Sequence, residues 1–176
     1  SRTNAGSVYI IFNSAATANP TSAPSASPTS RPTAKPTSSP TRAPIPPARA
    51  FANVDTAAFN ENQGIQIYGA AGSNNLGYSV SSAGDFNGDG INDVVIGAYK
   101  ANPNSKSSAG AAYVVFGKSS GLSNIDLASF TSTQGIQISG AANGDNLGYS
   151  VSSAGDFNGD GYVDLMVRAA NADPNS

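Results

Sequence analysis

Short apolar runs bounded by glycine, asparagine or serine recur along most of this chain. They occupy residues 76–80, 93–96, 110–116, 135–139, 147–151 and 164–167. In the first and fifth runs apolar residues alternate with small or polar ones, and the others are rich in β-branched residues. Both patterns are typical of strands, and no segment of useful length has the period of a helix. The pattern therefore predicts an all-β, antiparallel fold with four short strands per unit.

The pattern is a tandem repeat. Residues 63–90 and 134–161 agree at 24 of 28 positions, so the two segments are copies of one unit. The segment Gly-Ser-Val-Tyr-Ile-Ile-Phe at 6–12 matches Gly-Ala-Ala-Tyr-Val-Val-Phe at 110–116. We therefore divide the chain into the end of a preceding repeat, an insertion, one repeat and a truncated second repeat, at residues 1–12, 13–52, 53–123 and 124–176.

A proline-rich tract fills the insertion at 13–52. A proline falls at every fourth position from 20 to 44, among serine, threonine and alanine. Such a composition cannot bury a core and favours extended polyproline II segments, so we expect a disordered insertion. A plain linker and an O-glycosylated stalk both fit it. The matching sequences on either side place the tract in the loop between a third and a fourth strand.

Each repeat carries an acidic nine-residue loop after its first strand. The loops read Asp-Phe-Asn-Gly-Asp-Gly-Ile-Asn-Asp at 85–93 and Asp-Phe-Asn-Gly-Asp-Gly-Tyr-Val-Asp at 156–164. Oxygen-bearing side chains stand at loop positions 1, 3, 5 and 9, and position 7 offers its carbonyl. Three carboxylates and one amide suit Ca²⁺, although two metal-free acidic turns are the alternative. The candidate ligands of two Ca²⁺ ions are Asp85, Asn87, Asp89, Ile91, Asp93, and Asp156, Asn158, Asp160, Tyr162, Asp164.

The repeat unit has a strand, a calcium loop, an apolar strand that ends in Gly-Ala, and then a strand with the sequence Gly-x-x-Tyr-Val-Val-Phe. This order resembles the FG-GAP repeats of the integrin α-subunit β-propeller. Similar repeats occur in glycosylphosphatidylinositol-specific phospholipase D and in many algal and bacterial surface proteins. The likeness covers everything but the proline-rich tract, with Leu-Gly at 76–77 and 147–148 in place of Phe-Gly. It implies a partial β-propeller of about two four-stranded blades, in which two Ca²⁺ ions have a structural role.

Charge and composition limit the partners and the reactions that we expect for this chain. Residues 1–54 carry a net charge of +5 and residues 55–176 carry −7, and the basic residues are spread through the proline-rich tract, so we expect no nucleic-acid partner. The chain has no histidine and no cysteine, so we expect no catalysis and no transition metal. Asp55 and Asp126 are repeat equivalents, for which a turn or capping role is expected.

Recurrent aromatic residues invite two interpretations, a ligand platform or packing between blades. Most of them recur at the repeat period, which favours packing; the set is Tyr9, Phe12, Phe59, Tyr78, Tyr113, Phe116, Phe130 and Tyr149.

Two function classes follow from the repeats and the resemblance. The first is a calcium-binding extracellular or cell-surface repeat module for adhesion or recognition, with a protein or glycan ligand and with the other blades of a propeller as partners. The alternative is the accessory propeller of a secreted hydrolase resembling the phospholipase D named above. The chain has no apolar run of membrane-spanning length and no signal peptide, and it begins and stops within a repeat, so we expect a fragment. We also expect two incomplete blades to be marginally stable, calcium-dependent and prone to associate through their ends.

Overall fold

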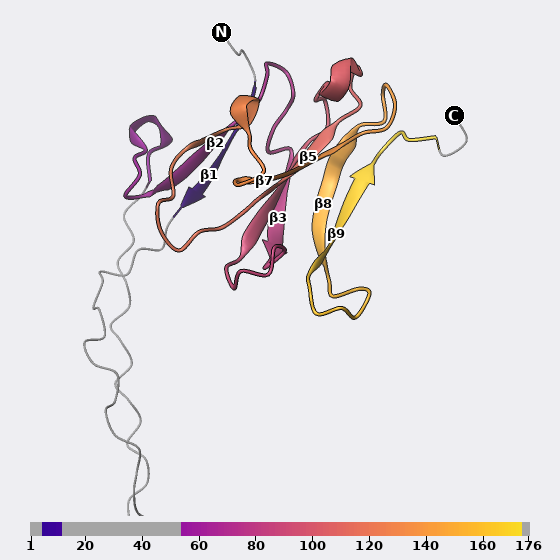
Figure 1. Ribbon diagram of the computed structural model, residues 1–176. Coiled ribbons are helices and arrows are strands. Elements are labelled where there is room, and N and C mark those ends of the chain that lie inside the picture. Colours follow the sequence, from indigo (N-terminus) through magenta and orange to yellow (C-terminus); the bar gives the residue numbers. More distant parts are fainter. Residues whose placement is uncertain (1–4, 12–53, 174–176) are drawn as a thin grey trace, which may run out of the picture. The chain divides into compact units, whose positions relative to one another are not determined.

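The computed structural model describes residues 5–11 and 54–173 (Figure 1). The described residues fall into two units, one containing residues 5–11 and 60–173 and the other containing residues 54–59. The predictions for the proline-rich tract and for Phe12 lie outside the described residues. The strands are β1 (Ser7–Ile11), β2 (Gly64–Tyr68), β3 (Ser79–Gly84), β4 (Asp93–Ala98), β5 (Ala111–Val115), β6 (Ile125–Asp126), β7 (Gly135–Ser139), β8 (Leu147–Gly155) and β9 (Asp164–Ala169). Three single-turn 3₁₀ helices complete the described elements: η1 (Thr56–Ala58), η2 (Pro103–Ser105) and η3 (Leu127–Ser129).

The strands form three sheets, and the all-β prediction is confirmed. The largest sheet has the order β3-β4-β5-β7, and each neighbouring pair in it is antiparallel. Strands β1 and β2 are antiparallel, β6 adds a short parallel pairing to β2, and β8 pairs antiparallel with β9. Several small antiparallel sheets are consistent with part of a β-propeller.

The strand before each acidic loop differs from its predicted bounds. Strand β3 begins at Ser79 rather than at residue 76, and both β3 and β8 continue to the glycine before the acidic loop. Asn75 and Gly77 have positive φ angles of 55° and 82°, so the backbone before β3 turns instead of running straight. Positive φ at Gly148 is accommodated inside β8, where the pairing with β9 shifts register.

Strand β5 is buried on both of its faces. All five of its residues are buried, and their side chains alternate between two apolar clusters. Tyr113 and Val115 lie with Ile65 and Ile67 of β2 in one cluster, while Val114 packs with Val151 of β8 in the other. The four-stranded sheet is thus covered by β1–β2 on one face and by β8–β9 on the other. Each large apolar side chain so buried contributes about 1.5–3 kcal/mol of transfer free energy.

The capping role expected for Asp55 and Asp126 is confirmed. Asp55 precedes η1, and its Oδ1 accepts a hydrogen bond from the backbone N–H of Ala57 at 2.9 Å. Asp126 precedes η3 and accepts from Ala128 N–H at 3.0 Å. A carboxylate that satisfies a free amide at the start of a helical turn is a normal N-cap. The two equivalent residues therefore have the same local structural role.

Four of these aromatic residues, Tyr78, Tyr149, Tyr113 and Phe130, make ring contacts. The rings of Tyr78 and Tyr149, which are repeat equivalents, lie 5.0 Å apart, and the Tyr78 hydroxyl donates to the Tyr149 hydroxyl at 3.1 Å. Tyr99 contacts both rings, with centroids at 4.5 Å from Tyr78 and 5.4 Å from Tyr149. Tyr113 meets Phe130 edge-on at 5.8 Å. The contacts of Tyr78 and Tyr99 with Tyr149, and that of Tyr113 with Phe130, join residues of successive repeats.

Alkaline pH should destabilise the fold through these phenols. Burial raises the pKa of Tyr113, and the hydrogen bond with Tyr149 is the main reason that the pKa of Tyr78 is raised. The neutral phenol is favoured in the folded state, so its stabilising effect is complete below the unfolded pKa of about 10 and is lost as pH rises through the folded value. Denaturant unfolding at stepped pH should show stability falling above pH about 10.

The variant Tyr113→Phe should make that fall shallower, and Tyr162→Phe, which removes an exposed phenol, is its control. Equal slopes for the two variants would contradict the expected contribution of Tyr113.

None of the helices in the described ranges has the length and apolar character needed to cross a bilayer.

Candidate calcium loops

The first acidic loop joins β3 to β4 and is ordered by its own side chains. Asp85 accepts backbone N–H groups with both oxygens, from Asp89 at 2.9 Å and from Gly90 at 2.8 Å. Asn87 Oδ1 also accepts from Asp89 N–H at 2.9 Å, and Asp89 Oδ1 accepts from Ile91 N–H at 2.9 Å. Each acceptor bonds a backbone group a few residues ahead of it, as the side chain of an Asx turn does. The hydrogen bonds of the loop itself therefore hold it in a curled conformation.

Two glycines allow this curl. Gly88 and Gly90 have φ angles of 76° and 85°, in the left-handed region that residues with a Cβ enter at a cost of about 1–2 kcal/mol. Gly159 and Gly161 repeat the conformation in the second loop, with φ of 79° and 91°. The glycines at loop positions 4 and 6 thus have a conformational reason for their spacing.

Asp93 closes the first loop from its far end. Its Oδ2 accepts from Phe86 N–H at 3.0 Å and from Asn87 N–H at 3.3 Å, while its Oδ1 accepts from Gly117 N–H at 2.8 Å. The residue is only 1 % exposed. Asp93 therefore fastens the loop to the segment that follows β5 as well as to itself.

The second loop, between β8 and β9, reproduces the internal network. Asp156 Oδ1 accepts from Asp160 N–H at 3.0 Å, and its Oδ2 accepts from Gly161 N–H at 3.0 Å. Asn158 Oδ1 bonds Asp160 N–H at 2.9 Å, and Asp160 Oδ1 bonds Tyr162 N–H at 2.9 Å. Two segments in successive repeats have the same folded loop. The repetition shows that the local sequence determines the loop conformation.

Asp164 repeats only part of the role of Asp93. Its Oδ2 accepts from Phe157 N–H at 2.8 Å and from Asn158 N–H at 3.3 Å, as in the first loop. It is more exposed than Asp93. The difference follows from the environment of the two loops, because the loop sequences agree at these positions.

The donor chemistry of the loops fits a hard divalent cation. The side chains at positions 1, 3, 5 and 9 offer oxygen, and a carboxylate oxygen that accepts one N–H retains a second lone pair. The structure gathers these side chains within each loop, but it does not bring them to a common point. Across residues 5–11 and 54–173, no group of three or more histidine, cysteine, aspartate or glutamate side chains lies close enough together to hold a metal ion.

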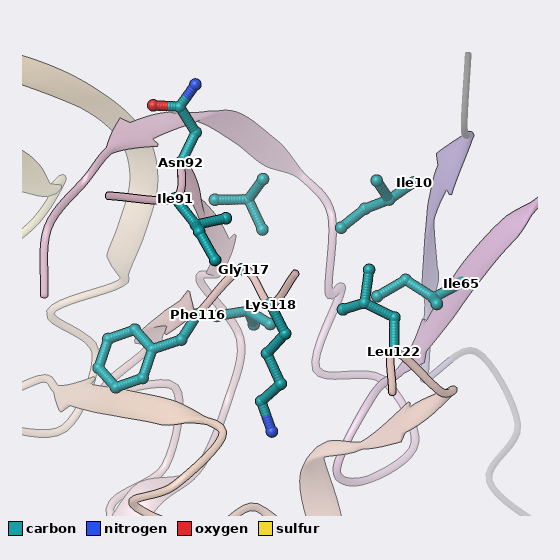
Figure 2. Close-up of a pocket in the computed structure, with 10 residues that line it drawn as sticks. Ile10, Ile65, Ile91, Asn92, Phe116, Gly117, Lys118 and Leu122 are labelled. Atoms are coloured by element: carbon teal, nitrogen blue, oxygen red, sulfur yellow. The ribbon is translucent and has the colours of Figure 1, made fainter. Parts of the chain in front are cut away.

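An apolar hollow lies beside the first loop, and sequence reasoning missed it. Figure 2 shows Ile10, Ile65 and Leu122 on one side of it and Ile91 on the other, with the ammonium group of Lys118 pointing away. Its volume is about 160 Å³. Ligand pockets are usually about 300–1,000 Å³, so the hollow is too small for a typical organic ligand. Its lining comes from four separate parts of the chain, which is why no local motif marks it.

The chain is similar to known proteins over the segments that carry the loops. The FG-GAP repeat family matches residues 76–115 and 147–176. Integrin alpha pat-2 of Caenorhabditis elegans is 34 % identical over 96 residues, 53 % of this chain, and integrin alpha pat-2 of Caenorhabditis briggsae is 36 % identical over 96 residues, again 53 % of this chain. Mouse integrin alpha-IIb is 32 % identical over 109 residues, 62 % of this chain. The matched segments are 7 % of the length of the two nematode proteins and 9 % of the mouse protein. The family resemblance inferred from the motifs is confirmed.

Proposed function

Because the chain carries FG-GAP repeats of the integrin α-subunit type, we propose that it is a calcium-stabilised β-propeller module for adhesion or recognition outside the cell. The observation that carries this proposal is the pair of acidic loops, which have the same oxygen donors at the same spacing and the same internal hydrogen bonds. The integrin relatives favour adhesion, and no observation favours the accessory propeller of a hydrolase.

Each loop would hold one Ca²⁺. The first ion would be held by the side chains of Asp85, Asn87, Asp89 and Asp93 with the carbonyl of Ile91. The second would be held by the equivalent set, which is Asp156, Asn158, Asp160, Asp164 and the carbonyl of Tyr162. A bound ion would neutralise three carboxylates that lie close together in the chain, and this is its expected structural contribution.

The loops are the part of the fold that gains most from an ion. Each loop is polar, is rich in glycine and has exposed acidic side chains at its tip. Millimolar calcium outside cells fills loops of modest affinity, which supports an extracellular setting. The ligand of the module would be a protein or a glycan that binds the propeller surface.

The sheets support a blade assignment. We assign β3-β4-β5-β7 as one complete blade, β1–β2 as the last two strands of a preceding blade and β8–β9 as the first two of a following blade. This assignment amounts to about two blades, and the proline-rich segment 13–52 would be inserted between the third and fourth strands of the preceding one.

Calorimetric titration of the folded chain with calcium tests the proposal. We expect about two Ca²⁺ per chain, since each loop offers four oxygen-bearing side chains and one carbonyl, and water can complete the roughly six to eight oxygens that Ca²⁺ takes. Asp85→Ala should remove only the first binding event, and Asp156→Ala should remove only the second. Asp126→Ala, which lies outside both loops, is the matched control and should retain both. Folded protein that gives no binding heat at millimolar calcium would refute the proposal.

A further inference from the structure

A second hollow lies between the β2–β3 loop, the β4–β5 loop and η3. Its volume is about 340 Å³, within the range of about 300–1,000 Å³ that is usual for ligand pockets. None of the residues that line it, all of them in the described part of the chain, carries a charge. We call it the polar hollow, after its hydrogen-bonding side chains Asn74, Asn102, Tyr113 and Gln137. Its size is that of a small-ligand site, and its chemistry suits a neutral ligand.

Two of these polar side chains are deeply buried and yet make no hydrogen bond. Tyr113 is 3 % exposed and Asn74 is 7 % exposed, and neither side chain has a hydrogen-bond partner among residues 5–11 and 54–173. In these ranges every side-chain nitrogen or oxygen atom that is closed off from solvent does have a partner. The Tyr113 hydroxyl and the Asn74 carboxamide therefore reach the polar hollow that both residues line. Because buried polar groups are normally bonded, two such groups at one hollow indicate a place for a ligand.

The preceding repeat contains the same tyrosine and glutamine in a bonded form. Tyr113 lies opposite Gln137 where β5 pairs with β7. At the equivalent place Tyr9 lies opposite Gln66, and Gln66 Nε2 donates to the Tyr9 hydroxyl at 2.9 Å. Gln137 Nε2 instead donates to Ser139 Oγ at 3.1 Å, where the preceding repeat has a tyrosine. Since the serine offers this glutamine another acceptor, the Tyr113 hydroxyl is left unbonded.

Asn74 also differs from its repeat equivalent. Asp145, at the same repeat position, accepts the backbone N–H of Ala142 with its Oδ2 at 2.7 Å, and Asn74 makes no such bond within the described residues. A third side chain, Asn102, accepts from Ser108 N–H at 2.6 Å with its Oδ1, which leaves its Nδ2 to donate elsewhere. The polar hollow therefore offers a hydroxyl, a carboxamide and a further amide nitrogen to a bound molecule.

We propose that the polar hollow binds one neutral sugar unit of a glycan. A sugar hydroxyl both donates and accepts, as water does, so it can replace water at these side chains without losing a hydrogen bond. The apolar part of the lining, which includes Ala101 and Leu127, suits the C–H face of a sugar ring. An ionic ligand would give up its hydration there and meet no countercharge. The inference rests on the recognition role of the proposed function and assigns its ligand to the glycans.

Titration of the folded chain with the methyl glycosides of glucose, galactose and mannose tests the proposal, with binding followed by NMR in millimolar calcium. We expect at least one of these glycosides to bind. Tyr113→Phe, which removes the hydroxyl from the hollow, should weaken that binding about three- to tenfold. Tyr9→Phe is the matched control, because it removes the equivalent hydroxyl outside the hollow, and it should leave the affinity unchanged.

A second variant, Ala128→Trp, places an indole at the hollow from an exposed position and should abolish binding in a folded chain. The proposal is overturned if no neutral glycoside binds at its highest soluble concentration, or if neither Tyr113→Phe nor Ala128→Trp weakens binding. Preference for glucuronic acid, or for N-acetylglutamine amide as the probe of a protein side chain, also overturns it. Calcium heats are recorded on the same sample. Two calcium events without glycoside binding would overturn this inference alone, and glycoside binding without calcium heats would overturn only the calcium sites.

Discussion

Replacing Gly148 by alanine is expected to lower the free energy of unfolding by about 3 kcal/mol or more. Gly148 has φ of +83°, and a Cβ there would clash with the carbonyl oxygen of Ala111 and lie 3.1 Å from the backbone N of Ala98. The left-handed conformation costs a residue with a Cβ about 1–2 kcal/mol. The clash adds about 1–3 kcal/mol because backbone atoms have to move apart. Strand β8 would be pushed away from the sheet on which it packs.

Gly144→Ala is the control that separates these two causes. Gly144 has φ of +82°, but nothing lies within 4 Å of a Cβ built on it. Gly144→Ala should therefore lower the free energy of unfolding by about 1–2 kcal/mol, which is the cost of the left-handed conformation alone. Urea unfolding of the wild-type chain and the two variants gives the comparison. Equal losses for both variants would mean that the close approach of β8 to the sheet contributes nothing to stability.

Asp93→Ala is expected to be the second severe change. It should lower the free energy of unfolding by about 3 kcal/mol even when calcium is removed by a chelator. The substitution leaves three backbone N–H groups without their acceptor, those of Phe86, Asn87 and Gly117. An unsatisfied buried donor costs about 1–3 kcal/mol, and water has little access because Asp93 is 1 % exposed.

Asp164→Ala is the matched variant for Asp93. Asp164 holds the same position in the second loop, but water can reach the groups it bonds, so the loss in chelator should be about 1 kcal/mol or less. Thermal melts with calcium and with chelator measure both variants. If the two losses in chelator are the same, the burial of Asp93 is not what makes it important. If the loss at Asp93 appears only when calcium is present, its contribution comes from the ion alone.

Local features were predictable from the order of residues. The acidic loops and the two caps depend on contacts within a few positions. The strands follow the pattern of apolar residues, while their pairing joins distant segments such as β1 and β2. Asp55 and Asp126 behave alike because each caps the turn that directly follows it. The two loops have the same network because nearly all of its donors and acceptors belong to the same loop. The apolar residues at 76 and 78 predict a strand from residue 76, but Gly77 has a positive φ and the strand begins at Ser79.

The sequence by itself determined an all-β repeat, the positions of two oxygen-rich loops and the family to which these motifs point. Only the tertiary structure decided which equivalent residues are buried. Val95 and Met166 occupy one repeat position, yet Val95 is buried in a cluster with Val114 of β5 and Val151 of β8, whereas Met166 is 63 % exposed. The same is true of Asp93, whose third hydrogen bond comes from Gly117 across the sheet. Burial and long-range hydrogen bonds depend on what packs from distant parts of the chain, and a local sequence that occurs twice cannot carry that information.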